Sequence, residues 1–323
     1  MWAYNETFYQ IYPIGFCGAP THNDGVTMHR ILKIADWAGY LEELGIGSII
    51  LNPIFESDNH GYDTRDLTKI DCRLGTNEDF QTVCETLHSH NIKIMLDGVF
   101  NHVGRGFWAF QDVLEKKWDS PYKDWFYINF DGNSAYNDGF WYEGWEGHYE
   151  LVKLNLQNPA VTDHLLSCIK MWIETFGIDG LRLDVAYSLD HNFMRRLRSF
   201  CEEIKPGFAL VGEVLFGDYN LIVNNEMLHS CTNYECYKGL YSSWASQTDD
   251  LNYTINYAEV FEAVKEEMKI PSQLLEHVIQ RIAGRLFHDF PQITEIKIAL
   301  FKQNPPMGAE CQETGVESIY TKD

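Results

Sequence analysis

The sequence predicts an α/β protein built on a parallel sheet, followed by a smaller α+β segment. Short apolar runs alternate with amphipathic helical runs from residue 8 to about residue 235, which is the rhythm of βα units. The apolar runs are continuous rather than alternating, as in strands buried on both faces. This rhythm ends near 244–252, so we expect domains at 1–244 and 245–323.

The expected elements of the first domain follow one another in regular order. Strands are expected at 8–13, 48–51, 92–100, 181–185, 208–214 and, more weakly, 229–235. Helices are expected at 30–45, 77–90, 158–177 and 191–204. Thr76 is a suitable N-cap for the second helix, with Asp79 in its first turn. Asn158 is a suitable cap for the third helix, with Pro159 in its first position.

An aromatic-rich insertion at 103–150 interrupts the rhythm after the third strand. It contains five of the nine tryptophans, at 108, 118, 125, 141 and 145. A loop of this length inside a compact domain is usually functional, and aromatic faces suit stacking on sugar rings. The alternative is a subdomain that uses these rings as its own core. We expect both uses, with most of the rings structural.

The second domain has a different character. A polar, linker-like stretch at 242–250 precedes expected helices at 257–268 and 272–286, a strand at 294–301 and a tail bearing Gly and Pro. No further βα unit of the earlier kind follows.

Composition excludes several classes of function. The formal net charge of the 323 residues is -22, which disfavours nucleic acid because phosphate contacts need clustered Lys and Arg. No signal peptide or membrane-length apolar run is apparent, so we expect a cytoplasmic protein. The eight cysteines form no CxxC pair and are expected to be free thiols. Cys231 and Cys236 are better explained as two strand residues than as zinc ligands.

Two acids follow neighbouring apolar strands, Asp184 in GLRLDVA and Glu213 in FALVGEVL. Burying an unpaired carboxylate costs several kcal/mol, so these positions need a reason. Two acids at adjacent strand ends are a candidate nucleophile and general acid for cleaving a glycosidic bond. A separation of about 5–5.5 Å would indicate a retaining mechanism.

Arg182 lies two residues before Asp184 on the same strand, so the two side chains share a face. A cation that close is expected to lower the pKa of Asp184, which suits a nucleophile. The alternative is an Arg–Asp pair that only fills the interior of a barrel.

Two further residues could contact a sugar. His102 comes just past a strand end, and Tyr62 follows the second strand by several residues. A single His is more often structural, and Tyr62 could equally be a packed loop residue.

These residues carry a resemblance. DGVFNH at 97–102, GLRLDVA at 180–186 and GEVL at 212–215, with HGYD at 60–63 and KLN at 153–155, resemble motifs of the alpha-amylase family of glycoside hydrolases. The resemblance covers about residues 5–243. The run YNDGFWYEGWEGHY at 136–149 is most similar to the bacterial maltodextrin-acting branch.

The resemblance implies a (β/α)8 TIM-type barrel with 103–150 as an inserted subdomain. It implies Asp184 as nucleophile and Glu213 as acid/base, with the sugar held by Arg182, His102, Tyr62 and Asp97. It implies an alpha-glucan substrate and no required cofactor. Asn101 matches a position that binds calcium in many members, so calcium is left open; Asp131-Gly132-Asn133 lacks the spacing of a calcium hand.

The chain also departs from this family. No Asn-His-Asp motif carrying the family's third acid follows residue 215. The single His-Asp pair, His288-Asp289, falls at a helix end and is expected on the surface. Six strands are expected and the last two are missing, so the barrel is incomplete and would expose two sheet edges. Loss of the third acid is expected to weaken transition-state binding by several kcal/mol.

The C-terminal segment resembles another family. TINYAEVFEAVKEEM at 254–268, LLEHVIQRIA at 274–283 and KQNPPM at 302–307 look like the C-terminal two-thirds of dihydroneopterin aldolase, a folate-biosynthesis enzyme. That resemblance implies proton transfer by Tyr257 and Lys302 and a pterin held by Glu276; the alternative for each is an ordinary polar residue. The family's first hairpin is absent.

Three interpretations follow. The leading one is a retaining alpha-glycosidase acting on maltodextrin- or starch-type glucans, joined to a partial pterin aldolase. The second is a working aldolase segment that binds a pterin. The third is an inactive gene fusion or a sugar-binding remnant. An oligomer is compatible with each.

Overall fold

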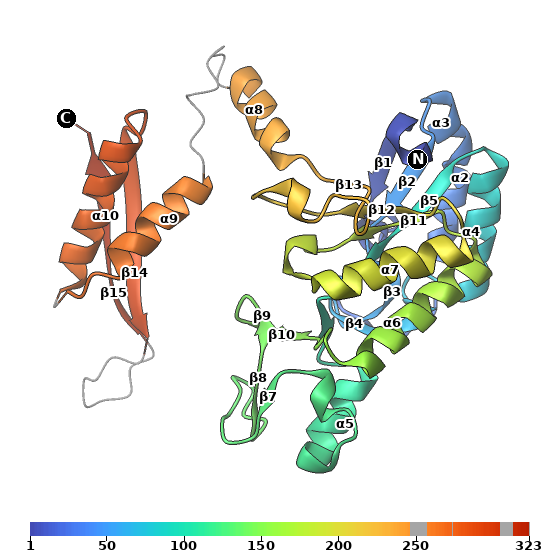
Figure 1. Ribbon diagram of the computed structural model, residues 1–323, viewed down its shortest axis with the longest axis horizontal. Helices are drawn as coiled ribbons and strands as arrows, with labels where there is room; N and C mark the ends of the chain where they lie inside the picture. The colour runs from blue at the N-terminus through green and yellow to red at the C-terminus, as the bar shows by residue number, and fades with distance from the viewer. Residues whose placement is uncertain (246–256, 273, 304–312, 323) are drawn as a thin grey trace. The chain divides into compact units, whose positions relative to one another are not determined.

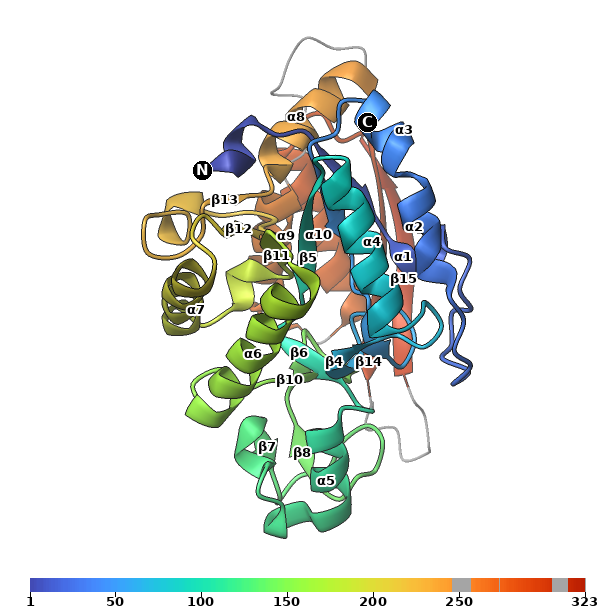
Figure 2. The same cartoon turned by 90° about the vertical axis from the view of Figure 1, so that its right-hand side faces the viewer.

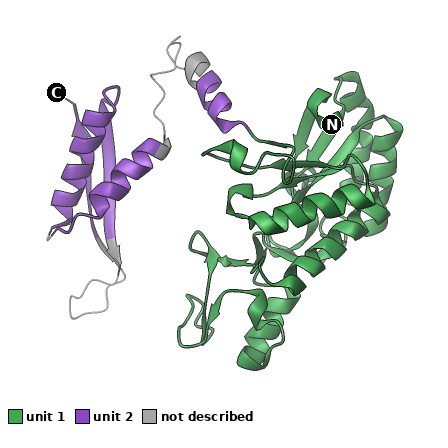
Figure 3. Cartoon of the chain, viewed as in Figure 1, with its two compact units in different colours: residues 1–232 green, residues 233–323 purple. Residues whose placement is uncertain are grey.

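The computed structural model describes residues 1–245, 257–272, 274–303 and 313–322. The chain forms two compact units, 1–232 and 233–323 (Figure 3). This boundary precedes helix α8 (Tyr234–Ala245), which we had assigned to the first domain. Residues 246–250 of the expected linker lie outside the described residues, and the division at 244 stays a prediction.

Six parallel strands form the main sheet of the first unit, and they are ordered in space as they are in sequence. They are β1 (Phe8–Ile11), β2 (Ser48–Leu51), β5 (Lys93–Gly98), β11 (Gly180–Leu183), β12 (Ala209–Gly212) and β13 (Ser230–Cys231). Each strand therefore adds to the same side of the previous one, and the sheet curls into a half-barrel. The predicted α/β class and parallel sheet are confirmed. Strand β2 has the expected bounds, whereas the other five strands are shorter than expected. Cys236, expected on a strand, lies on helix α8 instead.

Helices α4 (Asn77–Ser89), α6 (Pro159–Met171) and α7 (His191–Ile204) lie along the outer side of this sheet (Figures 1 and 2). Thr76 caps α4 in a capping box with Asp79, and Asn158 caps α6 through the amide of Ala160. Both predicted caps are confirmed.

Two expected helices differ in detail. The helix expected at 30–45 is three short pieces, η2 (Arg30–Leu32), α2 (Lys33–Asp36) and α3 (Ala38–Glu43). The helix expected at 158–177 ends in a π-helical turn, η5 (Trp172–Phe176). There the Trp172 ring stacks on Phe55 at 4.4 Å, and its Nε1 donates to the Leu67 carbonyl at 2.8 Å. These tertiary contacts accompany the altered helical turn.

Shorter elements fill the connections. Before the insertion lie η1 (Trp2–Asn5), α1 (Pro13–Phe16), β3 (Phe55–Ser57) and β4 (Thr64–Ile70). The insertion contains β6 (His102–Gly104), α5 (Trp108–Lys116), η3 (Lys117–Asp119), η4 (Lys123–Trp125), β7 (Ile128–Asn129), β8 (Trp141–Tyr142), β9 (Gly144–Trp145) and β10 (His148–Lys153). After β11 and β12 come η6 (Ala186–Ser188) and η7 (Tyr219–Leu221).

Most insertion aromatics form a local core. Phe110, Phe140 and Tyr142 are fully buried, whereas Trp118 is 64% exposed. Strand β10 pairs antiparallel with β6 and β9, which ties the insertion to the end of β5.

The second unit has its own small core. Helices α9 (Tyr257–Met268) and α10 (Leu275–Asp289) accompany an antiparallel pair, β14 (Glu295–Gln303) and β15 (Glu313–Thr321). The buried residues packed together in this core are Ala263, Val278, Ile282, Leu286 and Phe290. Strand β15 corrects the expectation of a tail in this region. Its sequence is only weakly apolar, and it forms a strand because it pairs with β14. None of the described helices is long and apolar enough to cross a membrane.

Candidate active site

Arg182 gathers three carboxylates at the carboxyl edge of the main sheet. Its Nη1 lies 2.7 Å from both oxygens of Asp97 and 2.9 Å from Oδ1 of Asp184. Its Nη2 lies 2.7 Å from Oε1 of Glu213. One cation therefore contacts three acids that come from three neighbouring strands, which brings together four of the predicted residues.

The backbone explains why these acids converge. Arg182 stands opposite Asp97 in the β5–β11 register. Past the strand ends the ladder continues, since the Asp184 amide donates to Gly98 and the Glu213 amide donates to Leu183. Val185 has φ of 40°, a left-handed conformation that is rare for a β-branched residue. In this turn its amide donates to Oε2 of Glu213 at 3.2 Å.

Asp97 also accepts hydrogen bonds from Asn52, which follows β2, and from Tyr62, which lies in the loop between β3 and β4. The Tyr62 hydroxyl and the Asn52 side-chain amide each donate to Oδ2 of Asp97 at 3.2 Å. Asn52 in turn accepts from Gln10 at 2.9 Å. The sequence reasoning missed Asn52 and Gln10, although Asn52 directly follows a predicted strand and so carried the same signal as Asp184.

The electrostatic prediction for Asp184 was wrong. Burial first, and then the charge of Asp97, raise the pKa of Asp184 to about 7, against the lowering effect of Arg182. Burial likewise raises the pKa of Asp97 to about 6. A single cation does not compensate the two buried carboxylates with the half-buried Glu213 beside them, so Asp97 and Asp184 hold their protons more strongly than ordinary aspartates.

His102 borders the same site as a neutral donor. It is 2% exposed, and burial, aided by the charge of His60, lowers its pKa to about 4. The Asn101 side-chain amide lies 3.2 Å from Nδ1; donation from that amide makes Nδ1 the acceptor and leaves the proton on Nε2. That Nε2 is buried and has no hydrogen-bond partner in the part of the chain that the structure describes.

A cavity of about 330 Å³ opens over these groups. The predicted residues Tyr62, His102, Arg182, Asp184 and Glu213 all line it. The sequence reasoning did not single out the other lining residues, which are His60, Trp145, Leu151, Val185, Tyr187 and Leu215. Trp145 belongs to the insertion whose aromatics were expected to include sugar-stacking rings. Its position at the cavity, which only the folded structure shows, distinguishes it from the core aromatics.

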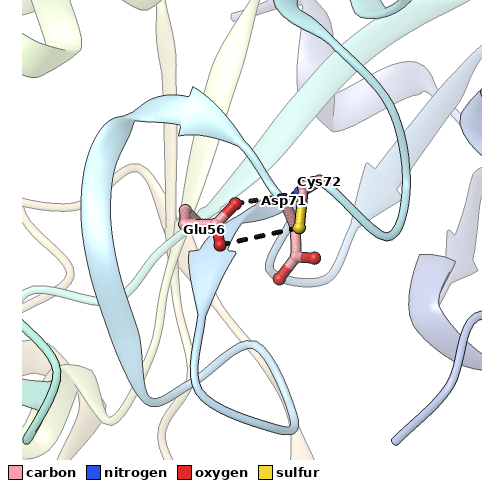
Figure 4. A group of neighbouring side chains, drawn as sticks. All are labelled: Glu56, Asp71 and Cys72. Atoms are coloured by element: carbon pink, nitrogen blue, oxygen red, sulfur yellow. Dashed lines mark hydrogen bonds between the residues drawn. The ribbon is translucent and has the colours of Figure 1, made fainter. Parts of the chain in front are cut away.

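A candidate metal site has a different explanation. In the part of the chain that the structure describes, the one group of His, Cys, Asp or Glu atoms close enough to share an ion is Glu56, Asp71 and Cys72 (Figure 4). Glu56 already accepts from the Cys72 amide and from Asn23, and Asp71 pairs with Arg73. These oxygens are engaged by protein donors, so the group fits a structural cluster better than a metal site. Asn101 lies outside it, and its calcium role stays a prediction.

The remaining predicted residues belong to the second unit. Glu276 is exposed in the first turn of α10. Tyr257 begins α9, and Lys302 pairs in β14 with Thr314; their side chains and residues 304–307 lie outside what the structure describes. His288, next to Asp289 at the end of α10, is 86% exposed, which confirms a surface position.

A half-barrel of parallel strands whose carboxyl edge carries clustered acids over a cavity defines an enzyme-like α/β class. A family model described as the catalytic domain of alpha amylase matches residues 10–303. The chain belongs to the alpha-amylase family.

Individual relatives agree with this assignment. The intracellular maltogenic amylase of Bacillus subtilis strain 168 is 32% identical over 340 residues, covering 98% of this chain and 56% of the relative. Neopullulanase 2 of Thermoactinomyces vulgaris is 36% identical over 231 residues, covering 66% and 39%. The chain spans about half the length of the curated relatives it matches.

A solved structure shares the fold. It is the cyclic alpha-maltosyl-(1→6)-maltose hydrolase from Arthrobacter globiformis, solved in complex with cyclic alpha-maltosyl-(1→6)-maltose. It superposes on this chain with a TM-score of 0.66 and 31% identity. The match covers 75% of this chain and 57% of that one.

Proposed function

We propose that this chain carries the site of a retaining alpha-glycoside hydrolase acting on maltodextrin- or starch-type alpha-glucans. The observation that supports it most is the single Arg182 guanidinium joining Asp184 and Glu213 beside the cavity. The names of the relatives, which include a maltogenic amylase and a neopullulanase, support the substrate class. The word intracellular in one of those names supports a cytoplasmic location.

In this proposal Asp184 attacks the anomeric carbon while Glu213 gives its proton to the glycosidic oxygen. The carbon–oxygen bond to the leaving sugar breaks, and an ester forms between the remaining sugar and Asp184. Water then attacks that ester, gives a proton to Glu213, and releases the sugar with its original anomeric configuration. Two displacements thus return both carboxyls to their starting states.

The other residues position the substrate. Arg182 fixes both reacting carboxyls, and Asp97, held by Tyr62 and Asn52, fixes Arg182. His102 offers its Nε2 proton at the cavity wall as a donor to a sugar hydroxyl. No organic cofactor is required by this chemistry.

The test is hydrolysis of a chromogenic maltooligosaccharide by the purified full chain. The wild type should release the chromophore, Asp184→Asn should lose at least about 10³-fold in rate, and Asp163→Asn should match the wild type. Asp163 is a suitable control because its side chain is 63% exposed, it pairs with Arg196, and it does not line the cavity. Equal rates for the wild type and Asp184→Asn, with both folded by circular dichroism, would contradict the proposal.

The pterin aldolase resemblance of the second unit stays a prediction. The alpha-amylase match extends through residue 303, so the comparisons lend the resemblance no support. A fluorescence titration of the full chain with a pterin tests it directly, and absence of binding at millimolar pterin would remove it.

A further inference from the structure

The tip of the β9–β10 hairpin reaches from the insertion to the cavity. His148 pairs with Trp145 across a two-residue turn. Both turn residues, Glu146 and Gly147, have positive φ, at 47° and 88°, which suits the tight turns that match strand twist. A side chain at Gly144 would come within 2.4 Å of the His148 carbonyl. The hairpin is therefore tightly paired, and the backbone of its tip has a well-defined turn conformation.

Trp145 is the residue of this tip that lines the cavity together with both reacting carboxyls. Its ring centroid lies 5.7 Å from that of His102 and 5.8 Å from that of His148. Among the residues that the structure describes, its buried indole Nε1 has no hydrogen-bond partner, and the same holds for Nε2 of His102. Two adjacent N–H donors without partners cost free energy, which a ligand offering hydroxyl oxygens would offset.

The same tip contacts the opposite side of the site. The Tyr187 hydroxyl donates to Oε1 of Glu146 at 3.5 Å, and Tyr187 follows Asp184 by three residues and also lines the cavity. Tyr187 packs in turn on Phe216, with ring centroids 5.7 Å apart. This contact links the insertion to the segments that follow β11 and β12. The cavity of about 330 Å³ is near the lower end of the range for ligand sites.

We propose that Trp145, held over the carboxyls by the hairpin tip and its contact with Tyr187, is a specificity-determining residue that binds a glucose unit and restricts the site to short glucans. Its ring face stacks on the apolar face of the sugar, and its Nε1–H donates to a hydroxyl. The proposal rests on the proposed hydrolase function, because it presumes a glucan at Asp184 and Glu213.

Calorimetric titration tests it in the full chain carrying Asp184→Asn, which should bind but not cleave. Adding Trp145→Phe, which keeps a ring and removes the donor, should raise the Kd for maltotriose about fivefold. Adding Trp145→Ala should raise it about 30-fold or more. Trp118→Phe is the matched control, since Trp118 belongs to the same insertion, is 64% exposed and should change nothing.

Chain length separates a specificity role from a merely structural one. Trp145→Ala should weaken maltoheptaose less than maltotriose, because the longer chain gains the space that the indole vacates. Equal affinities of the parent and Trp145→Ala for both sugars would overturn the role of Trp145 and leave the hydrolase proposal standing. If the folded Asp184→Asn parent binds neither sugar and the wild type cleaves neither, the hydrolase proposal fails and this inference fails with it.

Discussion

The first unit buries two arginines against carboxylates, and the two clusters differ in charge balance. Arg73 meets one acid, Asp71, through two contacts of 2.8 and 2.6 Å, and both side chains are fully buried. Its remaining donors reach the Ser57 hydroxyl and the carbonyls of Pro20, Thr21 and Asn59. Arg182 instead meets three acids, and its cluster borders a cavity.

This difference distinguishes a structural ion pair from a candidate active site. The Arg73 pair is neutral and its donors are satisfied, so it offers little to a ligand. In the Arg182 cluster burial first, and then the neighbouring negative charges, raise the pKa of Asp184 and Asp97. Perturbed carboxyls beside a cavity are what a functional site requires.

The largest expected effect is on stability, at the Arg73–Asp71 pair. Asp71→Asn should lower the free energy of unfolding by about 3–5 kcal/mol, because it leaves the Arg73 charge buried without compensation. Urea denaturation at pH 7 measures this change. A loss below about 1 kcal/mol would mean that the Arg73 carbonyl contacts suffice without the acid.

An Asp-to-Asn substitution in the Arg182 cluster should instead stabilise the protein. Because the folded-state pKa of Asp184 is about 7 against an ordinary 3.8, this carboxyl favours folding below about pH 4 and loses that contribution as the pH rises to 7. Asp184→Asn should therefore raise the free energy of unfolding by about 2–4 kcal/mol at pH 8.

The gain should be clearly smaller at pH 5, where less of the penalty has developed. Denaturation curves at the two pH values measure the difference. A variant that is less stable than the wild type at pH 8 would show that Arg182 needs the Asp184 charge for stability.

The smallest expected effect concerns the pH dependence of hydrolysis. In the proposed mechanism Asp184 must be ionised to attack, so kcat/KM should rise with an apparent pKa near 7. After burial, the charge of Asp97 is the largest cause that raises the pKa of Asp184. Asp97→Asn removes that charge, so the apparent pKa of the kcat/KM profile should fall by about one unit. Initial rates from pH 4 to 9 measure both profiles, and an unmoved profile would assign the titration to another group.

Much of the site could be predicted because its residues follow apolar strands. Asp184 and Glu213 sit at the ends of such strands, which places them at one edge of a parallel sheet, and in the structure Asp97 of β5 contacts the same Arg182 at this edge. Asn52 shared that signal and was overlooked. Trp145 could not be chosen among the insertion aromatics, because the rings of Phe110, Phe140 and Tyr142 look equivalent in sequence and differ only in what they pack against.

The sequence by itself determined the family, the parallel sheet and the placement of Asp184 and Glu213 at strand ends, since these depend on local pattern and on the order of motifs. The tertiary structure decided how those acids ionise. Asp97, Asp184 and Glu213 share one guanidinium only through the register of three strands, and burial then outweighs the neighbouring cation. Charge interactions depend on distance and desolvation, and neither exists until segments distant in the chain have packed together.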